Sequence, residues 1–301
     1  MIPPPPQLQR ISPAVAILPY GKKLGISPGR LSTCQFDWPL GMPGRLQGCR
    51  LSDLAEYDHL LIHPRSSHYY RLGFGTQARV SIWVLEPEIY HRKHVRKLKT
   101  SFSRFFRILT AIDELIAAVP NGVLVPFGST WIPNWRDVDC TKHRMTSLIA
   151  SEKAFLPLHR LRHEMAAWVW GCNLDVDVIG RGYKPFAHKW EGLAPYRFSI
   201  VIENAIQPNY FTEKLIDAIL CNTIPIYLGC PNIEKYIDPK GMIICNSMGD
   251  LQNAVCRTSV DLYDERIADL RKCREQALYY ADCGKRAAQR LLTEAMVVQQ
   301  R

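Results

Sequence analysis

Residues 196–231 constrain the fold of this chain more than any other stretch. They open with the β-branched and aromatic run 198–202 (FSIVI), which is typical of a buried strand, and a polar loop follows. Thr212 is a suitable N-cap, and apolar residues recur at helical spacing from Leu215 to Leu220, so a helix is expected there. Residues 224–228 (IPIYL) form a second strand candidate. This order predicts one βαβ unit and therefore a parallel sheet.

This unit gathers polar side chains at one edge of the predicted sheet. Glu203 and Asn204 follow the first strand, whereas Tyr210, Glu213 and Lys214 lie in the loop and the first helical turn. In open α/β sheets, ligands bind beyond the carboxyl ends of the strands and near helix N-termini. The set therefore predicts a site for a phosphorylated, hydroxyl-rich ligand. The alternative is a solvated first turn, where acids and lysines are common.

The run ENAIQPNYFTEK followed by TIPIYLGCPNI resembles the signature of the family 10 glycosyltransferases, the α-1,3/1,4-fucosyltransferases. In that family a Glu-Asn pair and a Tyr-x-Thr-Glu-Lys run precede a Pro-Ile-Tyr-x-Gly strand at the same separation. The match is clear in the C-terminal half and exists only in pieces in the N-terminal half. It implies an α/β, GT-B-like fold with a cleft between two Rossmann-like domains. We expect an acceptor-side domain at residues 1–135 and a GDP-sugar-binding domain with a helical tail at 136–301.

The resemblance also implies an activity. The expected reaction is inverting transfer of L-fucose from GDP-fucose to a hydroxyl of a glycan acceptor, in α-1,3 linkage to a GlcNAc- or Glc-type residue. Asn204, Tyr210, Glu213 and Lys214 would bind the donor, and Glu213 would also act on the fucosyl ring. No cofactor is expected to be required, and a divalent metal would at most stimulate. The alternatives are a catalytically degenerate GDP-sugar-binding protein and a transferase that uses another GDP-sugar.

A looser match in the first half suggests the catalytic base. Residues 80–85 (VSIWVL) predict a strand whose carboxyl end carries Glu86-Pro87-Glu88. The family places its base, a glutamate, at the end of a strand with this hydrophobic character, so the resemblance gives that role to Glu86. Glu88 is the alternative, because alternate residues of an extended segment point the same way. Both acids could instead be surface residues at a helix N-terminus.

A second looser match concerns the donor diphosphate. A helix expected at about residues 159–170 carries Arg160 and Arg162 in its first turn, where a guanidinium and a helix N-terminus can act together on phosphate. In the family an arginine near the start of this helix contacts the diphosphate. The resemblance matches that arginine to Arg162, with Arg160 left open. Two ordinary surface arginines are the alternative.

The motif Asp175-Val176-Asp177 has the DxD spacing of metal-nucleotide sites in another glycosyltransferase fold. Here it opens the predicted strand DVDVIG rather than closing one. Carboxylates at the start of a parallel strand lie at the edge of the sheet opposite to ligands. We therefore expect no metal ligands among these residues.

Positive charge is concentrated in residues 91–107 (HRKHVRKLKTSFSRFFR), which hold seven Lys or Arg and no acid. The rest of the chain contains 31 of the 38 basic residues and all 28 acidic residues. Most of the net charge of +10 therefore comes from residues 91–107. Apolar residues at spacings of three and four predict an amphipathic helix. Its basic face could contact an anionic membrane surface or a polyanion, or could simply be solvated. Nucleic acid is not favoured, because the aromatic residues lie in the apolar stripe.

The chain has ten cysteines but no CxxC pair. Several of the cysteines lie in or beside apolar runs, which is typical of buried free thiols. The N-terminus lacks the basic segment and apolar core of a signal peptide, and no apolar run is as long as a membrane helix. We therefore expect a cytoplasmic protein, with membrane association through residues 91–107 left open. A Golgi location would require a longer form of the chain that carries an anchor.

Overall fold

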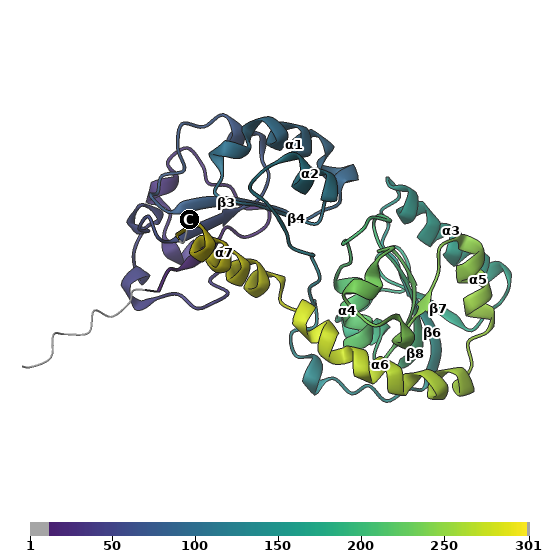
Figure 1. Ribbon diagram of the computed structural model, residues 1–301. Coiled ribbons are helices and arrows are strands. Elements are labelled where there is room, and N and C mark those ends of the chain that lie inside the picture. The colour runs from purple at the N-terminus through teal and green to yellow at the C-terminus, as the bar shows by residue number, and fades with distance from the viewer. Residues whose placement is uncertain (1–11, 300–301) are drawn as a thin grey trace, which may run out of the picture.

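The computed structural model describes residues 12–299 as two α/β lobes, each built on a five-stranded parallel sheet (Figure 1). The first sheet spans residues 15–124 and the second spans residues 144–244. Trp135–Asp137 is a short 3-10 turn in the extended segment that joins them. The expected α/β, two-lobed fold class is therefore confirmed, whereas residues 1–11 lie outside the described part.

The N-terminal sheet has its strands in sequence order, β1-β2-β3-β4-β5, and all neighbouring pairs are parallel. The strands are β1 (Val15–Ile17), β2 (His59–Ile62), β3 (Arg79–Val84), β4 (Ile108–Thr110) and β5 (Gly122–Leu124). Helix α1 (Glu88–Ser101) connects β3 to β4, and α2 (Asp113–Ala118) connects β4 to β5. Right-handed crossovers between strands in consecutive order all lie on one face of a sheet. The other face therefore needs a cover from elsewhere in the chain.

The last helix, α7 (Cys283–Gln299), supplies that cover (Figure 1). Its Ala287, Ala288 and Leu291 pack against Ile17, Leu61 and other side chains that alternate along the strands. The opposite face of the sheet packs against α1, α2 and the long loops. The helical tail was expected to belong with residues 136–301, but α7 instead completes the core of the N-terminal lobe.

The C-terminal sheet has the order β10-β9-β8-β6-β7, again with parallel neighbours. Its strands are β6 (Arg144–Ile149), β7 (Val176–Ile179), β8 (Tyr196–Ile202), β9 (Ile224–Leu228) and β10 (Ile243–Ile244). Helices α3 (Pro157–Gly171) and α5 (Met248–Cys256) lie on one face, and α4 (Glu213–Leu220) and α6 (Val260–Tyr280) on the other (Figure 1). The strand order reverses between β6 and β8. The carboxyl ends of these two strands are thus the expected ligand position in a doubly wound sheet.

The basic segment differs from its expected form. Residues 91–107 were predicted as one amphipathic helix, but α1 ends at Ser101, and a 3-10 turn over Phe102–Arg104 follows. The chain then joins the sheet, since the Phe106 N–H donates a hydrogen bond of 2.7 Å to the Val80 carbonyl. Phe105 and Phe106, at the end of the periodic pattern, therefore belong to the extended segment that leads into β4 and not to a helix.

Two expectations about composition can be compared with the structure. All ten cysteines are free, as their spacing predicted. Within residues 12–299, none of the helices combines the length and apolar character that crossing a membrane demands.

Candidate active site

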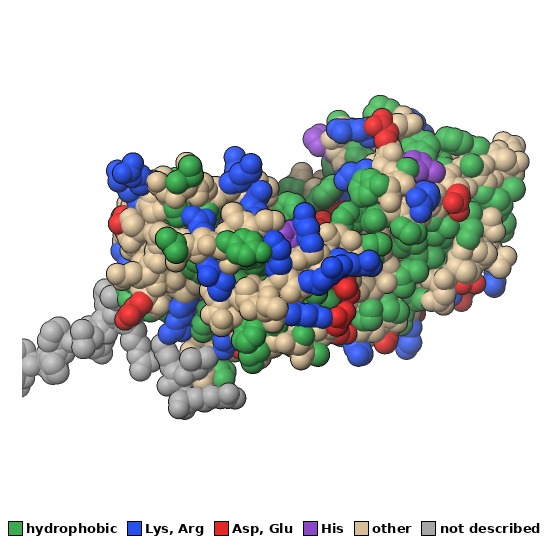
Figure 2. Space-filling model, turned by 90° about the horizontal axis from the view of Figure 1, so that it is seen from above, with side chains coloured by type: hydrophobic (Ala, Val, Ile, Leu, Met, Phe, Trp, Pro, Cys, Tyr) green, Lys and Arg blue, Asp and Glu red, His purple; other side chains and the backbone are tan. Residues whose placement is uncertain are grey.

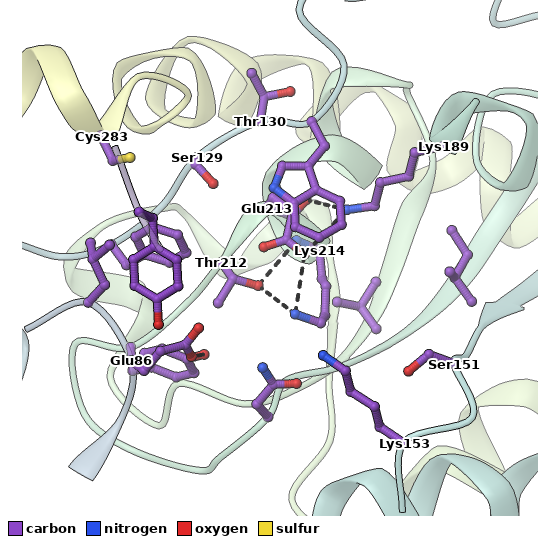
Figure 3. Close-up of a pocket in the computed structure, with 18 of the residues that line it drawn as sticks. Glu86, Ser129, Thr130, Ser151, Lys153, Lys189, Thr212, Glu213, Lys214 and Cys283 are labelled. Carbon is purple, nitrogen blue, oxygen red and sulfur yellow. Dashed lines mark hydrogen bonds and ion pairs between the residues drawn. The ribbon is translucent and has the colours of Figure 1, made fainter. Parts of the chain in front are cut away.

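A cleft of about 1170 Å³ lies between the two lobes, at the carboxyl ends of β3, β6 and β8. Six of the side chains that the sequence placed in the site line this cleft: Glu86, Arg162, Asn204, Tyr210, Glu213 and Lys214. Glu203, which the sequence placed at the same sheet edge, is fully buried and is not among the described lining residues. Of the open alternatives, Glu88 and Arg160 are not among the described lining residues. Figure 3 shows Glu86 on one side of the cleft and Glu213 and Lys214 on the other. The structure thus brings together residues that lie far apart in the sequence.

A buried carboxylate fixes the start of α4. Glu203 follows β8, is fully buried, and accepts hydrogen bonds from the Thr212 N–H at 2.8 Å and the Thr212 hydroxyl at 2.7 Å. Thr212 is the N-cap of α4, because its Oγ1 accepts a hydrogen bond from the Lys214 N–H. Burial raises the pKa of Glu203, and the nearby Lys214 opposes that shift. These contacts hold the α4 N-terminus at the cleft.

Glu213, the first residue of α4, is held between two cations (Figure 3). Its Oε1 lies 3.3 Å from the Lys214 Nζ and 3.6 Å from the Lys189 Nζ. Burial raises the pKa of Glu213, but the two lysines outweigh it and bring the pKa to about 2. The carboxylate is therefore ionised at neutral pH although its side chain is almost completely buried.

Lys189 and Asp217 belong to the same charge cluster, and the sequence did not predict either of them. The Lys189 Nζ lies 2.8 Å from Asp217 Oδ2, and the Asp217 carboxylate also accepts from the Thr130 hydroxyl at 2.5 Å. Asp217 stands four residues after Glu213 on one helix face, which is a spacing that could have revealed it. Lys189 comes from a separate 3-10 turn, Lys189–Gly192, and no motif marks it.

Arg162 of α3 is anchored by the last residue of β8. Its Nε and Nη2 donate to the Ile202 carbonyl at 3.0 and 2.6 Å, and Nη2 also donates to Asn204 Oδ1 at 3.0 Å. Burial lowers the pKa of Arg162, but a guanidinium stays protonated at neutral pH. Arg160 is exposed, because the first turn of α3 directs it away from the sheet. The structure therefore favours Arg162 as the cleft arginine.

Glu86 approaches this cationic wall from the N-terminal lobe. It stands two residues after β3, and its Oε2 accepts a hydrogen bond of 3.4 Å from the Tyr210 hydroxyl. Burial raises the pKa of Glu86, and Lys214 partly opposes the shift. Glu88, by contrast, is the first residue of α1, and its N–H donates to Gln207 Oε1 at 2.9 Å. The helix begins there, so the extended alternation that would have aligned Glu88 with Glu86 does not continue.

The DxD motif lies away from these residues. Asp177 is in β7, and its Oδ2 accepts from the Arg144 guanidinium at 2.6 Å and from the Tyr196 hydroxyl at 2.8 Å. Within residues 12–299 there is no group of three or more His, Cys, Asp or Glu arranged to hold a metal ion. The Asp177 carboxylate is a structural ion-pair partner.

Two lobes with parallel sheets and a cleft at their strand ends form the GT-B architecture. The solved structures agree. The chain is similar to an α1,3-fucosyltransferase solved with GDP, with a TM-score of 0.50, 15% identity and 90% of each chain covered. It is also similar to TarM, with a TM-score of 0.53, 10% identity, and 80% of this chain and 55% of that one covered. At these identities the likeness concerns the fold.

The sequence comparison is more specific for one part of the chain. Residues 142–257 match the model for glycosyltransferase family 10 (fucosyltransferase) C-term, so the resemblance to this family is confirmed over most of the C-terminal lobe. Among curated proteins, an alpha-(1,3)-fucosyltransferase FucT of Helicobacter pylori is 37% identical over 68 residues, or 23% of this chain. The Homo sapiens 4-galactosyl-N-acetylglucosaminide 3-alpha-L-fucosyltransferase FUT6 is 29% identical over 143 residues, or 40% of this chain. The matches span 14% and 35% of those two proteins.

Proposed function

We propose that this protein transfers L-fucose from GDP-fucose to a hydroxyl of a glycan acceptor, with inversion at the anomeric carbon. The supporting observation is that Glu86, Lys214 and Arg162 line one cleft, supplied by the segment after β3, by α4 and by α3. A displacement with inversion needs a base on the side opposite the leaving group. Glu86 is the carboxylate of the N-terminal wall that reaches the cationic side.

The donor half of the cleft suits a nucleoside diphosphate. Lys214 and Arg162 provide positive charge near the N-termini of α4 and α3, where backbone N–H groups also favour anions. Such fixed cations can stabilise the charge that develops on departing GDP. In this proposal they carry the charge stabilisation, so no divalent metal is required and an added one would at most stimulate.

Glu213 is proposed to act on the fucosyl ring. Its low pKa keeps it ionised, and Lys189 and Lys214 hold it in place. It can accept hydrogen bonds from sugar hydroxyls and favour the positive charge that develops on the ring as the bond to GDP breaks. Asn204, oriented by Arg162, and Tyr210 would fix the donor beside it.

In the reaction, the acceptor oxygen forms a bond to the anomeric carbon while the bond from that carbon to the GDP oxygen breaks. Glu86 takes the proton that the acceptor hydroxyl loses. Burial raises the pKa of Glu86, which makes its carboxylate a stronger base than an exposed one. The acceptor would lie against the aromatic side chains of the N-terminal wall, among them Phe36, Trp38 and Trp83.

The test combines donor binding with transfer. Isothermal titration of the full chain with GDP-fucose, with and without EDTA, should give the same affinity in both buffers. Transfer is then followed with N-acetyllactosamine as the acceptor, because the name of the matched human protein specifies a 4-galactosyl-N-acetylglucosaminide acceptor. The anomeric configuration of the product, measured by NMR, reports inversion.

Glu86→Gln and Glu88→Gln are matched variants for the base. The first should still bind GDP-fucose but lose transfer by about 10²–10⁴-fold, whereas the second should keep it. Binding without transfer by the unmodified chain would favour a degenerate GDP-sugar-binding protein. Preference for GDP-mannose over GDP-fucose would change the donor, and no binding of either would overturn the proposal.

A further inference from the structure

We propose that the N-terminal lobe carries a docking surface for an anionic lipid bilayer, formed by the exposed face of α1 and by two loops, residues 20–30 and 64–75. These two loops and residues 91–107 contain no Asp or Glu. Figure 2 views this side of the molecule and shows Lys and Arg gathered among hydrophobic side chains over the N-terminal lobe. A surface with this charge attracts the negative headgroups of a membrane.

The loops expose large apolar side chains at their tips. Leu72 is 108% exposed, Ile26 is 100% exposed and Tyr70 is 72% exposed. They are suited to entering the boundary between headgroups and acyl chains, where aliphatic and tyrosine side chains are stable.

Hydrogen bonds join the two loops and α1 into one surface. The Arg71 Nη2 donates to the Gly25 carbonyl at 3.2 Å, and its Nε donates to the Gly73 carbonyl at 2.7 Å. Arg104, just beyond α1, donates to the Arg71 carbonyl. Lys97 of α1 lies 4.8 Å from the ring centre of Tyr70. The apolar tips and the cations are therefore held in fixed relative positions.

This surface adjoins the mouth of the cleft. Arg65, in the second loop, donates to the Lys22 carbonyl at 3.1 Å and to the Gly21 carbonyl. The neighbouring Tyr20 lines the cleft, with its ring edge against His63 at 5.1 Å between centroids. Docking through the two loops would thus place the cleft beside the bilayer, where the headgroup region is accessible.

A lipid surface fits these observations better than nucleic acid does. Two of the three exposed apolar side chains, Ile26 and Leu72, are aliphatic. Aliphatic side chains gain little from stacking on bases. They do gain from leaving water for an apolar medium. The combination of cations with projecting aliphatic residues therefore points to a bilayer.

The test is co-sedimentation of the full chain with vesicles of equal parts phosphatidylglycerol and phosphatidylcholine, and with vesicles of phosphatidylcholine alone. We expect binding only to the mixed vesicles, weakened by salt. Lys93→Glu/Arg96→Glu should reduce the partition coefficient by about 10-fold or more, because each cation near the surface adds to binding. Both side chains are exposed and, within the described residues, make no ion pair.

The apolar part is tested with Ile26→Ser/Leu72→Ser, which should also weaken binding by about 10-fold. Two matched variants on the C-terminal lobe, Lys235→Glu/Arg271→Glu and Ile244→Ser/Val260→Ser, should bind as the unmodified chain does. Equal binding by all variants, or none to mixed vesicles, would overturn the proposal. Unchanged binding by Ile26→Ser/Leu72→Ser, with displacement by a single-stranded DNA oligonucleotide, would instead identify a polyanion site and would equally overturn it.

Discussion

The Tyr210 hydroxyl donates a hydrogen bond of 3.4 Å to the Glu86 carboxylate and thereby joins the loop after β8 to the end of β3 across the cleft. The same loop makes two further contacts with the N-terminal lobe. Asn209 Nδ2 donates to Asp113 Oδ1 at 2.7 Å, and Gln207 Oε1 accepts from the Glu88 N–H at 2.9 Å. The loop after β8 in the C-terminal lobe thus holds the proposed base of the N-terminal lobe in place.

Tyr210→Phe tests this link. The hydrogen bond favours the ionised form of Glu86, so its loss should raise the pKa of Glu86 further. Since the base must be ionised, the acidic limb of the kcat/KM profile should move to higher pH. Transfer at neutral pH should fall by about 10-fold, and the free energy of unfolding should change by about 1 kcal/mol.

The control for that variant is Tyr263→Phe. Its hydroxyl donates a hydrogen bond of 2.9 Å to the Asn222 carbonyl, away from the cleft. Tyr263→Phe should lower the free energy of unfolding by a similar amount and leave the pH profile of kcat/KM unchanged. An identical acidic limb in Tyr210→Phe and the unmodified chain would show that the phenol does not control Glu86.

Lys189→Met tests the charge cluster of Lys189, Glu213 and Asp217. The Lys189 Nζ lies 2.8 Å from Asp217 and 3.6 Å from Glu213, and both carboxylates are buried. Removing the cation leaves two buried acids short of positive charge, which typically costs about 3 kcal/mol. The pKa of Glu213 should rise, because Lys189 helps to lower it. Denaturant unfolding and the pH dependence of GDP-fucose binding measure these two effects.

Lys235→Met is the matched variant, because Lys235 is an exposed lysine of the same lobe that is not among the described cleft-lining residues. Its free energy of unfolding should change by less than about 0.5 kcal/mol. If Lys189→Met were equally harmless, the cluster would not need this lysine. Loss of donor binding with an unchanged unfolding midpoint would assign Lys189 to the ligand rather than to the fold.

The sequence was most informative where local pattern and site chemistry coincide. The strand, N-cap and helix of residues 196–220 have local signals, and these signals alone place Asn204, Tyr210, Glu213 and Lys214 at one sheet edge. That their side chains line one cleft agrees with this placement. Their roles in binding and catalysis stay predictions.

Other features depend on contacts that no local pattern encodes. Lys189 reaches Glu213 from a turn that carries no motif, and α7 covers a sheet that begins far earlier in the chain. The expected helix over residues 91–107 ended early because Phe106 pairs with Val80, a tertiary contact that overrides the helical period. These contacts were missed because the residues that make them lie in segments without a recognisable motif.

Glu203→Gln tests how the start of α4 is fixed. The carboxylate accepts from both donors of Thr212, whereas a glutamine offers only one oxygen. Its NH₂ would have to donate to the Thr212 hydroxyl oxygen, so that the hydroxyl proton loses its acceptor. A buried group left unpaired costs about 1–3 kcal/mol. The α4 N-terminus should lose its orientation, so we expect the Kd for GDP to rise by about 10-fold.

Thermal unfolding and titration calorimetry with GDP measure both changes. Glu234→Gln, at an exposed position in the 3-10 turn Ile233–Lys235, is the control and should match the unmodified chain in both. Unchanged GDP affinity in Glu203→Gln would separate the fold of this loop from donor binding.

Buried histidines should make the N-terminal lobe sensitive to acid. Burial lowers the pKa of His59, His63 and His68 to about 4 in each case. In the unfolded chain histidine takes up a proton below about pH 6.5. Between these values the unfolded state binds more protons, so the free energy of unfolding should fall as the pH falls from about 6.5 to 4. Each group can contribute on the order of 1–3 kcal/mol to this loss.

His59→Leu isolates one of these contributions. His59 is fully buried, and within the described residues neither of its ring nitrogens has a hydrogen-bond partner. Leucine cannot be protonated, so the variant should lose less stability than the unmodified chain when the pH is lowered from about 7 to 5. His143→Leu, at an exposed position, should lose as much as the unmodified chain. Denaturant titrations at both pH values measure the difference. Parallel losses in all three proteins would show that His59 is not part of the acid sensitivity, since removing a histidine that is buried in its neutral form removes its share of the proton uptake on unfolding.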